Sequence, residues 1–578
     1  MSPTRALWRA AQRLFRPGLP VWYRPEYRVP LPSIEARTGM QPRRAAWVLE
    51  WLLSERIVAL ADVRAPEQVT WDDLARVHEH GWLDALTLPE SLGRVFGLDP
   101  WEVPVDELLS SLRYAVGGTI DAAREAVRRN GPTLNLLGGF HHAGPNRGAG
   151  FCALNDIATA AAVLRAEGFK GSIAVLDLDA HPPDGTAACL GKGAWIGSIS
   201  GSDWGDLDGV DETVIPAATD DVYLAALDAL LGRMPSASLT FVLAGADVLA
   251  GDPLGQMALS LHGVRRRDAR VYERLSGGSV WLPAGGYRAE AWRVLAGTAL
   301  VLAGEPGAEI PAGYDPMAAG FGRIFASIPT SAFTLPDVEA ADIDATLLRR
   351  SGGTQLLGFY SVAGVELALA RYGILQQLRR LGYASFRVAT DRTEIGDRAR
   401  LWGTAEGKEH LLVEAVLERG LMAGRSVLFV HWLTLRHPRG AFAAGRTALP
   451  GQEVPGLGMA REAGALLATM AQRLGLAGVA FRPSWYHVAR SASPRMRFLD
   501  PGRQGRFEAL IRDTADLPLR EVSRALAEDR VVCGPEVYRW EPDDMVEWLA
   551  GGAEDRAAVE AEAARVRFAV SSGRPELG

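Results

Sequence analysis

The chain has 578 residues, of which 48% are hydrophobic and 23% are charged, a composition typical of a globular protein with large apolar cores. Its 62 basic and 69 acidic residues give a net charge of −7, so no general attraction for nucleic acid or for an anionic membrane is expected. Because one hydrophobic core rarely serves a chain of this length, we expect two main folded domains.

The cysteines and the N-terminal segment indicate the cellular compartment in which the protein is expected. Three cysteines that lie far apart in the sequence argue against a disulfide framework and favour a reducing environment. Residues 1–20 intersperse arginines with apolar side chains, which predicts a basic amphipathic extension, but they lack the continuous apolar run of a secretory signal. No segment is apolar enough for a transmembrane span. We therefore predict a cytoplasmic protein, and the sequence leaves its oligomeric state open.

Helical patterns alternate with short apolar runs from about residue 40 to residue 320. The helical patterns include residues 120–130, 156–169 and 222–234, and the apolar runs include residues 132–139, 172–180, 195–200 and 238–247. This alternation predicts an α/β domain with a parallel sheet between helices. Because open α/β sheets bind ligands at the carboxyl ends of their strands, we expect the chemistry in the turns that follow the apolar runs.

Acidic and imidazole side chains gather after the apolar run that begins at residue 172. Strand alternation places Asp177 and Asp179 on one side, and Asp184 follows in the next turn. Asp179 and His181 are close enough in sequence to bind one divalent cation, and Asp247, at the end of another apolar run, can supply a third ligand. Each acid alone could equally cap a helix, so the metal hypothesis depends on their coincidence.

Two further turns carry side chains suited to acid–base chemistry. The adjacent His141 and His142 follow the Gly138–Gly139 pair after an apolar run. Paired histidines suit the roles of a general base and of an electrostatic neighbour. Tyr287 follows two glycines after a later run, and its phenol could donate a hydrogen bond to a developing oxyanion.

Five ordered motifs resemble the histone deacetylase and acetylpolyamine amidohydrolase family over about residues 20–320. They read GGFHHA, GFCALNDIA, DLDAHPPDGT, AGADVLAGDPLG and PAGGY. The resemblance implies a three-layer arginase/deacetylase fold over residues 21–325. It also implies a deacylase that uses metal-activated water to hydrolyse the amide of acetyl-lysine in a protein or of an acetylpolyamine.

The resemblance also implies the metal ligands. Zinc would be held by Asp179, His181 and Asp247, although iron(II) or cobalt(II) would suit the same ligands. Potassium would bind next to the zinc, through oxygens of Asp177, Asp179, His181 and Ser198.

The catalytic roles follow from the same motifs. His142 would be the general base and later the general acid, oriented by Asp184. His141, paired with Asp177, would act electrostatically, and Tyr287 would hydrogen-bond the oxyanion.

The resemblance further implies a narrow substrate tunnel. Gly150 and Phe151 would form one wall, Trp204 the opposite wall, and Asp99 would contact the substrate backbone.

The motifs depart from the family at several positions, namely Phe140, Pro182, Pro183, Pro283 and Ala284. The two prolines after His181 could re-aim the loop that carries Asp184, because proline fixes φ and lacks a backbone donor. Pro283 and Ala284 replace glycines of the family before Gly285, so the sequence alone does not fix where Tyr287 is placed.

Two alternative functions follow from the same residues. An arginase-like two-metal hydrolase would need an aspartate two positions after His181, where Pro183 stands, so one metal fits better. A pseudoenzyme or acyl-binding sensor would keep the fold without turnover, which the complete set of site residues disfavours.

Residues 326–350 are rich in proline, small and acidic residues and predict a linker. After it, residues 351–550 predict an α+β domain, and residues 551–578 predict a charged helix and a loose tail. The expected elements of the α+β domain are strands at 355–360, 385–391, 410–418, 426–435 and 478–483, with helices over 364–382 and from about residue 458.

Within this domain, a strand, a Gly-rich turn, a helix and a strand faintly resemble the GNAT acyltransferases. The resemblance implies that Gln452, Gly456 and Gly458 could bind acetyl-CoA, with backbone amides around the pyrophosphate. An accessory domain with a glycine-capped helix is an equally good interpretation. The aromatic segment 485–487 could contact a ligand, but such residues more often pack in a core.

Overall fold

The computed structural model describes residues 18–31, 34–334, 355–440, 442, 448–552 and 555–571. The chain divides into two compact units, residues 1–319 and residues 320–578. Up to residue 17, the predicted basic extension lies outside the described residues, as does the predicted linker from residue 335 onward. The beginning of that linker contains the end of a helix and a short 3-10 helix, Thr330–Ala332.

An eight-stranded parallel sheet forms the centre of the first unit, in the order β2-β1-β3-β8-β7-β4-β5-β6. Its strands are β1 (Val21–Trp22), β2 (Val63–Arg64), β3 (Pro132–Asn135), β4 (Ile173–Asp177), β5 (Trp195–Ser200), β6 (Val210–Val214), β7 (Leu239–Leu243) and β8 (Gly278–Leu282). Every residue of β4, β7 and β8 is buried, which explains why these strands are continuous apolar runs in the sequence.

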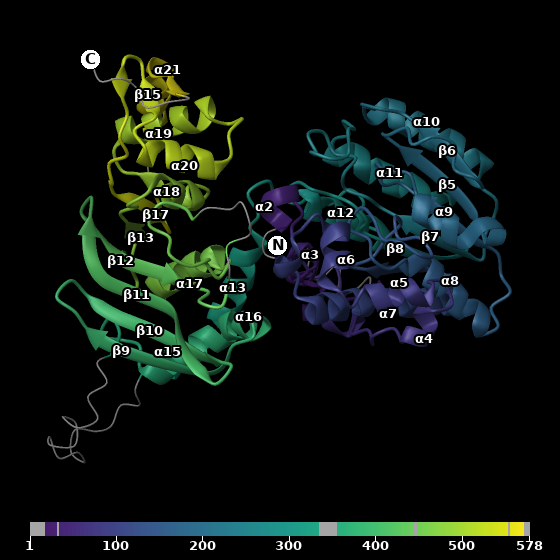
Figure 1. Ribbon diagram of the computed structural model, residues 1–578, viewed down its shortest axis with the longest axis horizontal. Helices are drawn as coiled ribbons and strands as arrows, with labels where there is room; N and C mark the ends of the chain where they lie inside the picture. The colour runs from purple at the N-terminus through teal and green to yellow at the C-terminus, as the bar shows by residue number, and fades with distance from the viewer. Residues whose placement is uncertain are drawn as a thin grey trace, which may run out of the picture. The chain divides into compact units, whose positions relative to one another are not determined.

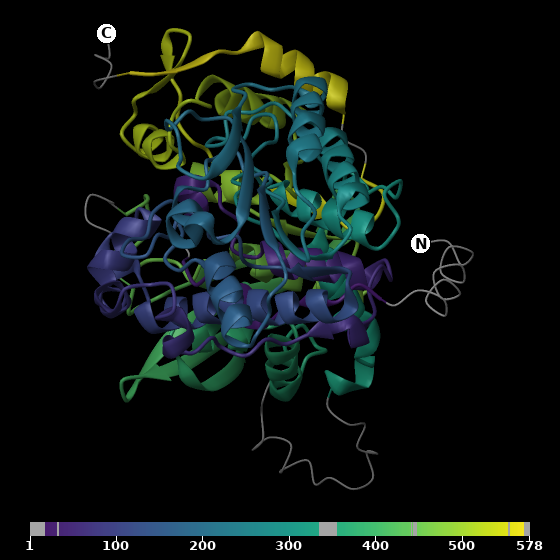
Figure 2. The ribbon, with the colours of Figure 1, turned by 90° about the vertical axis from the view of Figure 1, so that its right-hand side faces the viewer.

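Helices cover both faces of this sheet, as Figures 1 and 2 show. The crossover connections that contain α7 (Val105–Arg129), α8 (Asp156–Ala166) and α9 (Asp184–Leu190) each lead to a strand nearer the β6 edge of the sheet. Those that contain α10 (Asp220–Arg233) and α11 (Leu261–Arg274) each lead to a strand nearer the β2 edge. Because parallel crossovers are right-handed, the two groups lie on opposite faces. The predicted three-layer fold is thereby confirmed.

The remaining helices of the first unit lie before α7 or after β8. They are α2 (Ile34–Thr38), α3 (Arg44–Ser54), α4 (Trp71–Leu74), α5 (His80–Ala85), α6 (Pro89–Phe96), α12 (Ala291–Leu302) and α13 (Pro316–Ser327), the last of which crosses the boundary between the units. Within the described ranges of the whole chain, no helix has both the length and the apolarity to cross a membrane.

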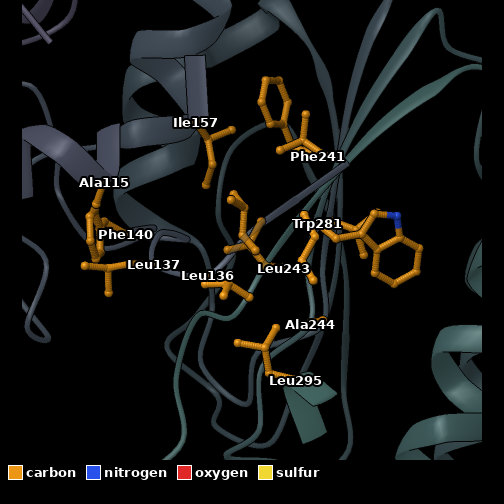
Figure 3. Close-up of a cluster of buried hydrophobic side chains, with 14 of the residues drawn as sticks. Ala115, Leu136, Leu137, Phe140, Ile157, Phe241, Leu243, Ala244, Trp281 and Leu295 are labelled. Carbon is orange, nitrogen blue, oxygen red and sulfur yellow. The ribbon is translucent and has the colours of Figure 1, made fainter. Parts of the chain in front are cut away.

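A buried apolar core surrounds the central strands. Figure 3 shows Phe241 and Leu243 of β7 among the side chains around Trp281 of β8, all three of which are fully buried. The Trp281 indole N–H donates to Oγ of Ser279 at 3.1 Å, so burial leaves this donor satisfied. Each such apolar side chain stabilises the fold by about 1.5–3 kcal/mol through burial. The strand ends therefore form a rigid platform.

The second unit contains a seven-stranded mixed sheet in the order β14-β17-β13-β12-β11-β10-β9, as expected for an α+β domain. Its strands are β9 (Ala384–Arg392), β10 (Asp397–Ala405), β11 (Lys408–Met422), β12 (Arg425–Leu435), β13 (Gly478–Phe481), β14 (Arg497–Phe498) and β17 (Met545–Trp548). Among the strands described in this sheet, only β12 and β13 pair in parallel, because α17 (Ala460–Arg473) connects them.

Smaller elements complete this unit. A three-stranded sheet consists of β15 (Val531–Cys533), β16 (Glu536–Val537) and β18 (Phe568–Val570). The other helices are α15 (Val362–Arg371), α16 (Ile374–Arg380), α18 (Tyr486–Ala492), α19 (Pro501–Asp513), α20 (Leu519–Ala527) and α21 (Arg556–Arg565).

Three local predictions for the second unit were wrong. The strand expected at 355–360 is only an isolated bridge between Leu356 and Tyr360. The helix expected over 364–382 breaks into α15 and α16 at Gly373, whose φ of 77° is incompatible with a continuous helix. The charged helix expected up to residue 568 ends at Arg565 and is followed by strand β18, whereas the predicted loose tail, residues 571–578, lies outside the described residues apart from Ser571.

Candidate active site

Three potential metal ligands meet where β4 and β7 end. Asp179 and His181 follow β4, Asp247 follows β7, and the two strands are neighbours in the sheet. One ligand atom from each side chain lies within 4.8 Å of the other two. His181 Nδ1 is 3.0 Å from Oδ1 of Asp179 and 3.1 Å from Oδ2 of Asp247. The structure therefore brings the predicted ligand set together.

The electrostatics of this cluster favour a cation. Asp179 and Asp247 are both buried, and burial together with the neighbouring charge of Asp179 raises the pKa of Asp247 to about 7. Two buried carboxylates that lie close together repel each other, and a divalent ion between them removes this repulsion. The donor set of two carboxylates and one imidazole suits a divalent metal ion.

The two predicted histidines lie next to this cluster, each held by its own carboxylate. His141 Nδ1 is 2.8 Å from Oδ2 of Asp177, and His142 Nδ1 is 2.7 Å from Oδ1 of Asp184. The imidazole rings are 4.0 Å apart, and the ring of His142 is 5.9 Å from that of His181. Because an ionised carboxylate only accepts hydrogen bonds, each Nδ1 carries the hydrogen and each Nε2 is the other titrating atom.

Their surroundings drive the pKa values of the two histidines apart. Burial lowers the pKa of His141, but the charges of Asp177 and Asp179 outweigh this effect and raise it to about 9. Burial and the positive charge on His141 lower the pKa of His142 to about 4. A neutral His142 next to a cationic His141 can therefore accept a proton, which divides the roles of the pair.

The glycine pair before the histidines allows a close backbone approach. A Cβ on Gly138 would lie 2.6 Å from Oδ2 of Asp156, and a Cβ on Gly139, whose φ is 83°, would lie 3.0 Å from Ala284. The Asp156 carboxylate accepts hydrogen bonds from the N–H groups of Gly139 at 3.0 Å and Phe140 at 2.8 Å. Asp156 thus holds the histidine turn, a role that sequence reasoning missed because the residue looks like an ordinary first-turn acid of α8.

The loop that carries Tyr287 is hydrogen-bonded directly to one of the candidate metal ligands. The Gly285 N–H donates to Oδ2 of Asp179 at 2.7 Å, and the Tyr287 N–H donates to Oδ2 of Asp252 at 2.8 Å. Burial and then the charges of Asp179 and Asp247 raise the pKa of the Tyr287 phenol well above its usual range. The phenol therefore stays protonated and can donate a hydrogen bond.

A second anchor of this loop is Arg44 at the start of α3. Its guanidinium donates to the carbonyls of Ala284 at 2.7 Å and Gly285 at 3.1 Å. Ala284 has a φ of 45°, so alanine adopts here the left-handed conformation that glycine would adopt more easily. Sequence reasoning missed Arg44, because nothing in the segment RRAAW distinguishes it from a surface arginine.

Aromatic rings line the approach to the histidines. The Trp204 ring stacks on that of His142 at 5.2 Å and is 50% exposed, while the Phe151 ring lies 5.5 Å from that of Tyr287. A Cβ on Gly150 would lie only 2.3 Å from Cδ2 of His142, so glycine allows this approach. The structure thus brings Phe151 and Trp204 to the site. Asp99 lies just after α6, at the start of a 3-10 helix, and its role as a substrate clamp stays a prediction.

The prolines after His181 do not displace the loop. The Asp184 N–H donates to the Pro182 carbonyl at 3.0 Å, and α9 begins at Asp184, directly after Pro183. Proline fits at a helix N-terminus because its missing N–H would have no partner in the helix. Asp184 therefore still reaches His142.

In the second unit, the predicted CoA-binding residues lie before α17. Gly456 forms a bridge with Arg436, and Gly458 has a φ of 66°. The Gln452 side-chain carbonyl accepts a hydrogen bond from the Leu449 N–H at 3.2 Å, so part of this side chain stabilises its own turn. In the aromatic segment, Tyr486 is buried against Phe507 and Trp540, which favours the core interpretation for this residue.

Comparisons with known proteins agree on one family. The sequence model of the histone deacetylase domain matches residues 38–200. An uncharacterised protein of Picosynechococcus is 34% identical over 44% of this chain and 86% of its own length. Histone deacetylase 2 of Arabidopsis thaliana is 30% identical over 47% of this chain and 76% of its own length. A probable deacetylase of Archaeoglobus fulgidus is 28% identical over 41% and 71%, respectively.

Among solved structures, the crystal structure of the HDA15 HD domain is similar, with a TM-score of 0.41 and 20% identity. The match covers 52% of this chain and 92% of that chain.

Proposed function

The chain belongs to the histone deacetylase family, and on that premise we propose that its first unit is a zinc-dependent deacylase that hydrolyses the amide of an acylated amine. The observation that carries the proposal is the meeting of Asp179, His181 and Asp247 beside two histidine–carboxylate pairs at one edge of the sheet. Acetyl-lysine in a protein and acetylpolyamines are the two substrate classes that this chemistry fits.

Asp179, His181 and Asp247 would hold the zinc ion. Their burial, their mutual proximity and the mixed oxygen and nitrogen donors support this assignment. When bound, zinc would polarise the substrate carbonyl and lower the pKa of a water molecule towards neutrality.

His142 performs the proton transfers in this proposal. Asp184 fixes its Nδ1–H, so Nε2 is left unprotonated and takes a proton from the attacking water. The same nitrogen then gives the proton to the departing amine as the carbon–nitrogen bond breaks. The products are the free amine and the carboxylic acid, and no covalent intermediate with the protein is formed.

Tyr287 and His141 stabilise charge. The protonated Tyr287 phenol donates a hydrogen bond to the oxyanion that develops from the amide carbonyl. His141, held as a cation by Asp177, favours the negative charge that accumulates in the site.

A potassium ion next to the zinc is part of the proposal. Among the described residues, the hydroxyl of Ser198 on β5 is buried and has no hydrogen-bond partner. Ser198 lies directly across from Asp177 in the sheet register. A buried hydroxyl without a partner is costly, and a monovalent cation between it and the Asp177 carboxylate would remove that cost.

A substrate panel tests the proposal and names the substrate class. Acetyl-lysine peptides, acetylated polyamines and longer acyl-lysines are incubated with wild type and with His142→Ala. We expect release of the acyl group from one class by wild type only. Turnover of none of them by a zinc-loaded chain would instead support the alternative of an acyl-binding sensor.

We also propose that the second unit binds acyl-CoA. Strand β13 ends at Phe481, opposite Val430, whereas β12 continues to Leu435, where the Gly-rich turn before α17 pairs with the chain through the bridge between Arg436 and Gly456. Titration calorimetry with acetyl-CoA tests this proposal. Binding by wild type that is lost in Gly458→Val would support it, and no heat of binding to wild type would refute it.

A further inference from the structure

Arg267 on α11 is a fully buried cation next to the backbone segments that carry the candidate metal ligands. It is 0% exposed, as is the next residue, Asp268. Its Nε donates to Oδ1 of Asp268 at 2.9 Å, and the hydroxyl of Thr298 on α12 donates to the other oxygen of Asp268 at 2.6 Å. Helices α11 and α12 pack together, as Figure 1 shows. A buried charge is costly even when paired, so a role beyond packing is expected.

Another nitrogen of the guanidinium donates hydrogen bonds to the two backbone segments that carry the candidate metal ligands. Nη1 donates to the carbonyl of Leu178 at 3.2 Å and to that of Gly245 at 2.9 Å. Leu178 directly precedes Asp179, and Gly245 stands two residues before Asp247. One nitrogen therefore joins the ends of β4 and β7 at the point where each delivers a carboxylate.

The two segments are also in direct contact at this point. A Cβ on Gly245 would lie 2.7 Å from Cα of Asp179, so the backbones approach as closely as glycine allows. On the other side, the Ala180 N–H donates to Oδ1 of Asp247 at 3.1 Å. Besides Arg267, this hydrogen bond, the sheet pairing and the contacts of His181 with both side chains hold Asp179 and Asp247 in place.

We infer that Arg267 is a positioning residue that fixes the spacing of Asp179 and Asp247, with Asp268 and Thr298 orienting its guanidinium. The inference rests on the proposed metal site and names residues that set its affinity. Lysine cannot replace arginine here, because a single ammonium group lacks the planar fork that joins a carboxylate on one edge to two carbonyls on the other. Changes in residues that orient metal ligands typically weaken metal binding about 10–100-fold.

Cobalt(II) binding tests the inference without relying on turnover. Wild type, Arg267→Lys and the milder Thr298→Val are titrated with cobalt(II), and affinity and the visible absorption spectrum are recorded. We expect Arg267→Lys to bind at least about 10-fold more weakly and with an altered spectrum. We expect Thr298→Val, which keeps the arginine but loosens Asp268, to show a smaller weakening in the same direction.

Arg265 on the same helix provides the matched control. It also donates to backbone carbonyls, those of Pro306 and Ala308, which lie in a segment that carries no ligand. Arg265→Met should lower the melting temperature and leave cobalt affinity unchanged. Wild-type affinity and spectrum in folded Arg267→Lys and Thr298→Val would overturn the inference while leaving the proposed function intact. Absence of cobalt binding by wild type would overturn the proposed function and the inference with it.

Discussion

His142 Nδ1 lies 2.7 Å from Oδ1 of Asp184, and this contact sets which nitrogen of the imidazole carries the hydrogen. In Asp184→Asn, a neutral amide replaces the carboxylate, so it neither fixes the tautomer as firmly nor stabilises the imidazolium that forms. We expect kcat to fall by about 10²-fold or more, with zinc content unchanged. The exposed Asp208→Asn is the control and should keep wild-type kcat. Equal kcat for Asp184→Asn and wild type would exclude the assigned role of Asp184.

Gly150 lies against the imidazole of His142 and leaves no room for a side chain. Alanine there would place Cβ 2.3 Å from Cδ2 of His142, at a φ of 51°. We expect Gly150→Ala to reduce kcat at least about 10-fold, since a shift of about 1 Å in a reacting group can cost 10²-fold in rate. In Gly144→Ala, the nearest atom would be a flexible part of Arg147 at 3.4 Å, so activity should be retained. The ratio of kcat between the two variants is the measurement, and a ratio near one would contradict the prediction.

Removing the Tyr287 hydroxyl isolates its contribution to the transition state. Tyr287→Phe keeps the ring next to Phe151 but loses the donor. We expect kcat to fall by about 10²–10³-fold with little change in KM, because the oxyanion exists only in the transition state. Tyr314→Phe, which loses a hydroxyl bonded to Ser54, serves as the control. A loss that appears in KM alone would assign Tyr287 to substrate binding instead.

His78 predicts a pH dependence of stability. Its Nδ1 lies 2.9 Å from the Gly144 carbonyl, and the Asn155 N–H donates to its Nε2 at 3.0 Å, so only the neutral ring satisfies both partners. Burial lowers its pKa below 6.5. The unfolded chain therefore takes up the proton first as the pH falls, and stability drops below about pH 6.5 by up to about 1.4 kcal/mol per pH unit.

Denaturant unfolding between pH 7.5 and 5.5 checks this dependence. We expect His78→Gln to show a shallower loss of unfolding free energy than wild type, because its side chain does not titrate. The exposed neighbour His80→Gln should keep the wild-type slope. The same slope in all three proteins would show that His78 does not contribute.

Much of the first unit could be predicted, because its chemistry stands in short motifs at strand ends. The spacing of Asp177, Asp179 and His181 follows from strand alternation, and the position of Asp247 follows from the apolar run before it. What the sequence hides are residues whose role depends on tertiary contacts. Arg267 is one of three consecutive arginines on α11, and nothing in such a run indicates which of them is buried, so only the structure shows that Arg267 points inward.

The second unit was predicted less well for local reasons. Strand β10 was missed because it contains no continuous apolar run, although Arg398 and Arg400 alternate with Ala399 and Leu401 as in a half-buried strand. Their charges are satisfied across the sheet by Asp391 of β9, a pairing that only the strand register reveals.

Metal dependence of amide hydrolysis is the most direct test of the central claim. The purified chain is analysed for metal and assayed on the acetyl-lysine and acetylpolyamine panel before chelation, after chelation and after return of zinc. We predict about one zinc per chain, activity lost with the chelator and restored with zinc, and neither zinc nor activity in Asp247→Ala. Hydrolysis that persists in the fully metal-free chain would contradict the account.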